Sequence, residues 1–135
     1  MSLFSTQINT RYSYTGSGLF EIFYCFFLGC AFSGNGGSLN LETDTVIMSN
    51  CAFIDSVSSG VNKGGSFFIK SSSFSIKLCC MNSCYSQKYG AAGYIDSTNF
   101  ELENTIITNC TGNTNTFHAL SQNSTIKNVN LSFAK

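Results

Sequence analysis

The residues of this sequence with the clearest capacity for chemistry are its seven cysteines. Cys79, Cys80 and Cys84 share the segment CCMNSC, and their thiolates could bind zinc. Structural zinc takes four ligands, usually from paired C-x2–4-C segments, and no second pair in this chain has matching spacing. Disulfides are the other alternative, but seven is an odd number, so at least one thiol stays free. A free thiol favours a reducing compartment.

The acidic residues are the next candidates, because paired carboxylates about 5–10 Å apart hydrolyse glycosidic bonds. The chain contains Glu21, Glu42, Asp44, Asp55, Asp96, Glu101 and Glu103. Glu101 and Glu103 share an outward face of a predicted strand, and Glu21 occupies the repeat position of Glu101. We interpret these as solvated outward charges, and Asp44 and Asp55 as turn residues.

His118 is the only histidine, and no Cys–His–Asn or Ser–His–Asp set can be placed around it by repeat position. The segments GSG and GNGG lie between predicted strands with no helix after them, so they are turns rather than phosphate loops. We therefore expect no catalytic residue, no metal ligand and no cofactor. The chain is predicted not to be an enzyme.

The composition favours a single all-β domain. Of the 135 residues only 10% are charged, 13 are phenylalanine, and proline and tryptophan are absent. Seven basic residues balance seven acidic ones, which argues against nucleic acid as a partner.

No targeting or membrane-spanning segment is visible in the chain. The most apolar stretch, Leu19 to Phe32, contains Glu21 and is shorter than the roughly 20 residues that span a bilayer. The start of the chain is polar and lacks the features of a signal peptide. Two alternatives therefore stay open: the protein is cytosolic, or the chain is a piece of a longer exported protein.

A repeat of about 27 residues organises the chain. Gly37, Gly65 and Gly93 are spaced by 28 and 28 residues, and Ala119 follows 26 residues later. A second series keeps step with the first at offsets of 26, 28 and 26: CFFLGC, CAFIDS, CCMNSC and TIITNC, which begin at Cys25, Cys51, Cys79 and Thr105. Two series in step predict repeats over residues 18–135, with a degenerate last coil at about 112–135 and a candidate cap at 1–17.

Inside each unit the apolar residues alternate with a period of two, which is typical of a strand with one face toward a core. One unit reads Phe74, Ile76, Leu78, Cys80, so we expect Cys80 to point inward. The apolar phase then slips by one residue, to Phe27, Phe53, Met81 and Ile107, which predicts a bend.

Short strands with this period predict a parallel β-helix, a solenoid of about four to five coils in which equivalent residues stack about 4.8 Å apart. The expected columns include Leu39/Phe67/Ile95 and Gly37/Gly65/Gly93. Six cysteines fall into two columns, Cys25/Cys51/Cys79 and Cys30/Cys84/Cys110, with Ser56 in the gap of the second. This stacking favours cysteines that act as small core residues over cysteines that form disulfides. It also argues against a metal site, in which Cys25, Cys30 or Cys110 would have to supply the fourth ligand beside Cys79, Cys80 and Cys84.

Two short motifs carry a resemblance to a known family. GGSL, GGSF and AGYI match a "GGA(I/L)" segment, and FLGC and FIDS loosely match an "FxxN" segment. The chain thereby resembles the repeats of the chlamydial polymorphic outer-membrane proteins and similar β-helix proteins of parasitic protists, over about Gly18 to Thr111. The resemblance implies a right-handed β-helix at a cell surface, with a role in adhesion.

These observations predict a non-catalytic β-helix module with a structural or adhesive role and a protein or glycan partner. The alternative is a carbohydrate-binding or pectate-lyase-like β-helix, for which exposed Tyr85, Tyr89 and Tyr94 could stack on sugars. The open ends of a solenoid also favour end-to-end self-association or a place in a larger assembly.

Overall fold

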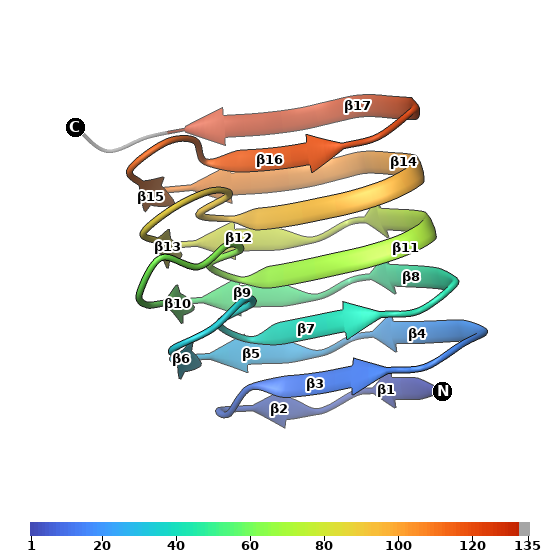
Figure 1. Cartoon of the computed structure of the whole chain (residues 1–135), viewed down its shortest axis with the longest axis horizontal. Coiled ribbons are helices and arrows are strands. Elements are labelled where there is room, and N and C mark those ends of the chain that lie inside the picture. Colours follow the sequence, from blue (N-terminus) through green and yellow to red (C-terminus); the bar gives the residue numbers. More distant parts are fainter. Residues whose placement is uncertain (133–135) are drawn as a thin grey trace.

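The computed structural model describes residues 1–132, which form strands and turns without any helix. The chain winds into a solenoid of about five turns with a repeat of about 26 residues. In Figure 1 the front strands run left to right and the back strands right to left while the chain climbs from the N to the C end, so the solenoid is right-handed. The predicted right-handed parallel β-helix is confirmed.

The strands stack in four parallel rows. Row A contains β3 (Tyr12–Thr15), β7 (Leu39–Glu42), the first half of β11 (Phe67–Lys77), the first part of β14 (Gly93–Thr108), and β16 (Phe117–Leu120). Row B contains β1 (Ser2–Phe4), β4 (Leu19–Phe23), β8 (Thr45–Ser49), the second half of β11, the middle of β14, and the start of β17 (Asn123–Ser132). Row C contains β2 (Gln7–Ile8), β5 (Phe26–Leu28), β9 (Ala52–Ile54), β12 (Cys80–Asn82), and the ends of β14 and β17. Row D contains the short strands β6 (Ala31–Phe32), β10 (Val57–Ser58), β13 (Tyr85–Ser86) and β15 (Thr111–Gly112).

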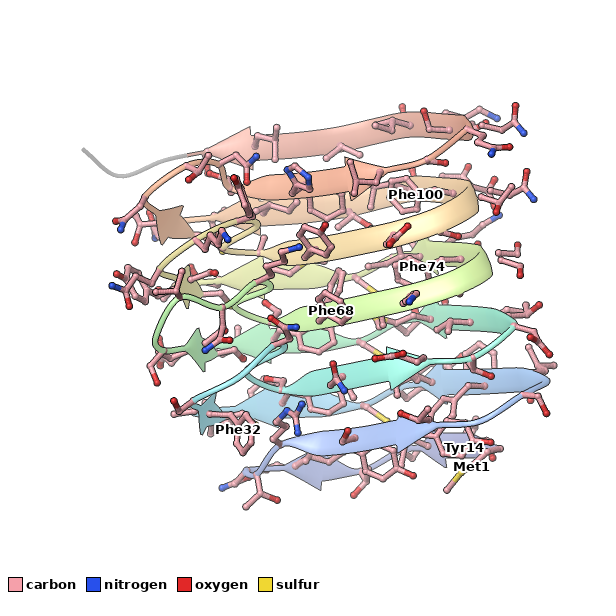
Figure 2. The ribbon with its side chains drawn as sticks, viewed as in Figure 1. Met1, Tyr14, Phe32, Phe68, Phe74 and Phe100 are labelled. Carbon is pink, nitrogen blue, oxygen red and sulfur yellow. The ribbon has the colours of Figure 1, made fainter. Side chains whose placement is uncertain are left out.

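The core is a set of stacked apolar columns inside these rows. Phe27 and Phe53 stack with ring centroids 4.6 Å apart, one coil above the other. Phe74 and Phe100 repeat the arrangement in row B at 5.9 Å (Figure 2). Burying such rings removes large apolar areas from water, which is the main force that holds the coils together.

The bend predicted at the slip in apolar phase lies between rows B and C. One residue of each coil there has a left-handed backbone: Ser5, Tyr24, Asn50, Leu78, Asn104 and Asn128, with φ between 45° and 55°. The left-handed residue turns the chain, and the next residue, such as Cys51 after Asn50, points into the core. A second left-handed column, Gly29, Asp55, Ser83 and Asn109, turns the chain from row C to row D.

The register of the glycine column differs from the prediction at its third member. Gly93 pairs with Phe67, and Ala119 pairs with Ile95, so the glycine column continues as Gly37, Gly65 and Ala91. The predicted column Leu39/Phe67/Ile95 is wrong at the same place, because Ile95 pairs with Ile69 and the column is Leu39/Phe67/Gly93. The prediction was wrong by two residues because the pattern has a period of two and a shift of two keeps every inward residue inward. Gly93 instead provides room for the Phe67 ring of the coil below.

Both terminal segments are built as coils. Strands β1, β2 and β3, within the candidate cap 1–17, pair with β4, β5 and β7 in the register of the repeats. Strands β16 and β17 extend rows A, B and C through Ser132. Residues 133–135 of the predicted last coil lie outside the described residues.

Candidate functional site: the outer faces of the solenoid

The cysteine columns lie in the core at the two bends that flank row C. Cys25, Cys51 and Cys79 occupy the first bend, and six of the seven cysteines of the chain are buried with their thiols unbridged. The Cys51 thiol, followed by burial, raises the pKa of Cys79, so this thiol stays protonated. Burial likewise raises the pKa of Cys25. A buried protonated thiol is a poor nucleophile and a poor metal ligand.

Cys80 does not point into the core, and that prediction was wrong. It follows buried Cys79 on the far side of the left-handed residue Leu78, and the change of direction at Leu78 turns Cys80 to the outer face of β12. Its thiol is half-buried and stands apart from the two columns. Within residues 1–132 no three His, Cys, Asp or Glu side chains gather closely enough to hold a metal ion.

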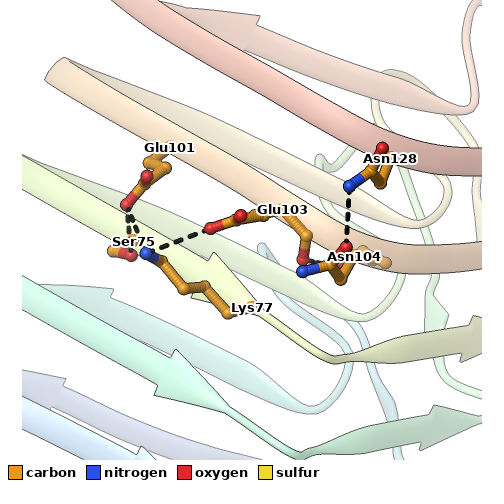
Figure 3. A network of polar contacts seen from close by, with 7 residues as sticks. Ser75, Lys77, Glu101, Glu103, Asn104 and Asn128 are labelled. Carbon is orange, nitrogen blue, oxygen red and sulfur yellow. Dashed lines mark hydrogen bonds and ion pairs between the residues drawn. The ribbon is translucent and has the colours of Figure 1, made fainter.

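The outward carboxylates form an ion-pair ladder on row B. Lys77 Nζ lies 3.1 Å from Glu101 Oε2 and 3.2 Å from Glu103 Oε2, and Ser75 Oγ donates to Glu101 (Figure 3). Lys77 lowers the pKa of Glu101, so this carboxylate is ionised and paired with the lysine ammonium. A shallow groove beside it is lined by polar side chains that include Asn99, Gln122 and Asn123.

The predicted turn residues lie in turns. Asp55 takes the left-handed position of its column, with φ of 54°. Asp44 accepts a hydrogen bond of 2.7 Å from the backbone N–H of Gly18 in the coil below. Glu21 occupies the column of Glu101, separated from it by Ile47 and Ser75.

His118 belongs to an aromatic ladder on the outside of row A. Its ring stacks on Tyr94 at 4.9 Å, and Tyr94 stacks on Phe68 at 5.2 Å, with the planes within 7° of parallel. Lys63 lies over the Tyr94 ring and donates to its hydroxyl at 3.1 Å. The expectation that Tyr94 is exposed for sugar stacking was wrong, because these neighbours leave it 4% exposed.

An apolar side face on row C was missed from the sequence. We use this name for the outward side chains Tyr24, Phe26, Leu78, Cys80 and Ile106, of which Tyr24, Leu78 and Ile106 are 58%, 55% and 48% exposed. A groove of about 520 Å³ runs between Tyr24, Phe26, Leu78 and Cys80 of this face, and Asn50, Ala52, Cys25 and Cys51 complete its lining. The alternation with a period of two predicts that Cys80, and with it the equivalent residues Phe26 and Ile106 of other coils, point into the core. The signal that could have found them was the polar Asn50 and Asn104 at the same repeat position as Leu78, which indicates an exposed turn.

Comparisons with protein families, with curated proteins and with solved structures find no match to this chain. The resemblance to the chlamydial and protist repeats therefore stays a hypothesis that depends on the short motifs. The described part of the chain has no helix of the length and apolarity needed to cross a membrane. Fold and surface together define the class: a right-handed parallel β-solenoid with an apolar side face.

Proposed function

We propose that this chain is a non-catalytic β-solenoid module that binds a protein partner through its apolar side face. The observation that carries the proposal is a line of exposed apolar side chains along this face. Tyr24 and Leu78 lie two coils apart at the bend position, with Asn50 between them, and Ile106 stacks on Cys80 in row C. Contiguous apolar patches on soluble proteins mark interaction sites, because their burial against a partner releases water. The family resemblance supports a location at a cell surface and a role in adhesion.

The chemistry of the other faces also supports a binding role. The carboxylates Glu101 and Glu103 share Lys77, which lowers the pKa of Glu101, the opposite of what a general acid needs. His118 is stacked between aromatic rings, and its Nδ1 lies 2.9 Å from Asn115 Nδ2. A partner for the side face therefore presents apolar side chains rather than a strong charge.

A photo-crosslinker attached to the half-buried Cys80 thiol tests this proposal, because that thiol lies within the side face. Proteins captured by the probe are purified, and their affinity for the wild-type chain is measured by calorimetry. We expect Leu78→Ser and Ile106→Ser to weaken binding by tenfold or more, as for anchors in an interface. Val61→Ser, which changes an exposed apolar residue of another loop, is the matched control and leaves binding unchanged. Equal affinity for all variants contradicts the proposal.

A carbohydrate-binding or carbohydrate-active role is the second candidate, and the polar groove beside Glu101 favours it. Asn99, Gln122 and Asn123 offer amide donors and acceptors there to a hydroxyl-rich ligand. A glycan array with the wild-type chain tests binding, and release of reducing sugar from the bound glycans tests hydrolysis. Glu101→Gln and Asn123→Ala should both lower binding if this groove is the site.

A further inference from the structure

In residues 1–132 the first and the last coil of the solenoid expose the cross-section of the core. Strands β1, β2 and β3 at one end, and β16 and β17 at the other, pair with a neighbour on one side only within the described chain. Such edges present rows of unpaired N–H and C=O groups that can accept another strand. Figure 1 shows the terminal coils as the bottom and top layers of the stack, with no segment folded across them.

The core columns reach both ends with apolar residues. The column of row B runs from Leu3 through Met48 to Ile126, and that of row C runs from Ile8 through Phe53 to Leu131. Ile126 and Leu131 are 59% and 52% exposed, although their equivalents in the inner coils are buried. Both ends therefore lack one layer of the packing that every inner coil has.

The side chains at the two ends are complementary in size. In row A the column that begins with Tyr14 ends with Ala119. In row B, Met1 precedes Ser2 and so lies in the column of Phe20 and Phe100, which ends with Ser124. Two large side chains at the N-terminal end, Met1 and Tyr14 (Figure 2), thus face positions that are small at the C-terminal end, whereas Tyr12 faces the large Phe117. Alternating large and small residues across a contact is how layers interdigitate at high density.

Among the described residues no charged side chain points into either cross-section. Strands β1, β2 and β3 contain no charged side chain, and the α-ammonium of Met1 donates to Leu19 O in the next coil. Arg11 Nε and Nη2 donate at 3.0 Å to carbonyls of the second coil, which turns its charge away from the open end. Lys127 on β17 pairs with the outward position of Glu103. Inward-pointing lysines are a usual protection of sheet edges, and residues 1–132 have none at either end, since Lys127 on the edge strand β17 points outward.

We propose that the C-terminal end of one molecule stacks on the N-terminal end of a second copy, so that β16 pairs with β3 and β17 pairs with β1 and β2 of the next molecule. The pairing is parallel and keeps all core columns in register across the junction. The contact is head-to-tail and does not close, so it produces linear rods. It uses the ends of the solenoid and is independent of the side face.

Two variants, each blocked at one end, test the proposal. The N-end variant combines Leu3→Lys with Ser13→Pro. The N–H of Tyr12 donates to Ser38 O of the second coil at 2.8 Å, so the N–H of the next residue, Ser13, points to the open side. Proline at residue 13 removes this N–H without breaking a bond inside the molecule. The C-end variant combines Ala119→Lys with Ile126→Lys, both at exposed positions. Circular dichroism confirms that each variant is folded, and Ala119→Lys alone serves as a second C-end block.

Mass is then measured by sedimentation over a wide range of concentration. We expect the wild-type mass to grow with concentration, each variant alone to stay monomeric, and an equimolar mixture of the two to double in mass and grow no further. Ile106→Lys on the side face is the control and should assemble like the wild type. A wild type that is monomeric at every concentration overturns the proposal. So does a mixture that stays monomeric, or a blocked variant that dimerises alone through two like ends.

Discussion

Gly93 lies opposite Phe67 in adjacent coils, and a Cβ on Gly93 would be 2.4 Å from Cε2 and Cζ of the Phe67 ring. The ring is fully buried and is held at its edges by Phe53, Phe74 and Phe117. The missing side chain at residue 93 is therefore what admits a phenylalanine into this layer of the core.

This contact predicts that Gly93→Ala destabilises the fold. Overpacking of a filled core costs about 1–3 kcal/mol, and we expect a loss of that size in urea unfolding. Phe67→Leu alone also destabilises, through the cavity it leaves. The double variant should lose less free energy of unfolding than the two single variants lose together, because the smaller leucine makes room for the Cβ at position 93. Additive losses would show that the two positions do not interact.

The left-handed column predicts a stabilising substitution, Leu78→Asn. Leu78 has φ of 52° and is exposed, whereas the same position in the coils above holds Asn104 and Asn128, whose amides hydrogen-bond at 3.0 Å (Figure 3). Asparagine tolerates this backbone better than leucine, for which the cost is about 1–2 kcal/mol. We expect a gain of roughly 1 kcal/mol in the free energy of unfolding. The reverse change, Asn50→Leu, is the control and should lower stability.

The single histidine predicts a pH dependence of stability. Burial, followed by the charge of Lys63, lowers the pKa of His118 below its ordinary value. The unfolded chain then binds a proton more readily than the folded one, so stability falls as the pH drops through about 6.5 toward the lowered pKa. His118→Phe keeps the aromatic stack but cannot titrate, so the melting temperature of this variant should change less with pH in this window. The histidine ring resonances in NMR should titrate below the ordinary value; titration above it would contradict the placement.

The thiol arrangement predicts selective modification. Cys80 is the half-buried cysteine and the other six are buried, so a maleimide should label one thiol in the native chain and seven after unfolding. Intact mass spectrometry counts the labels, and Cys80→Ser should abolish the native one. Fewer than seven labels in unfolded, unreduced protein would reveal a disulfide. Native labelling of Cys51 or Cys79 would contradict the core columns.

The sequence was sufficient for the fold class because a solenoid repeats one set of local requirements in every coil. Phe27, Phe53, Met81 and Ile107 form the predicted column, and the cysteine columns stack as expected. The positions of several carboxylates could also be predicted, because Asp44 and Asp55 lie in turns and Glu101 and Glu103 lie on an outward face, as expected.

The surface could not be read in the same way. The orientation of Cys80 depends on the left-handed backbone at Leu78, a residue type that rarely adopts it. Within that coil nothing marked the change of face, and only Asn50 and Asn104 at the same position of other coils indicate the turn. The burial of Tyr94 comes from Phe68, Lys63 and His118, which lie 26, 31 and 24 residues away.

The sequence alone therefore determined the β-strand period, the length of the coil and the composition of the main core columns, because these depend on alternation within one strand and its repetition. Only the tertiary structure decided the register at Gly93, the apolar side face and the complementary ends. Those features depend on contacts between coils, where a shift of two residues preserves the pattern along the chain but changes which side chains meet.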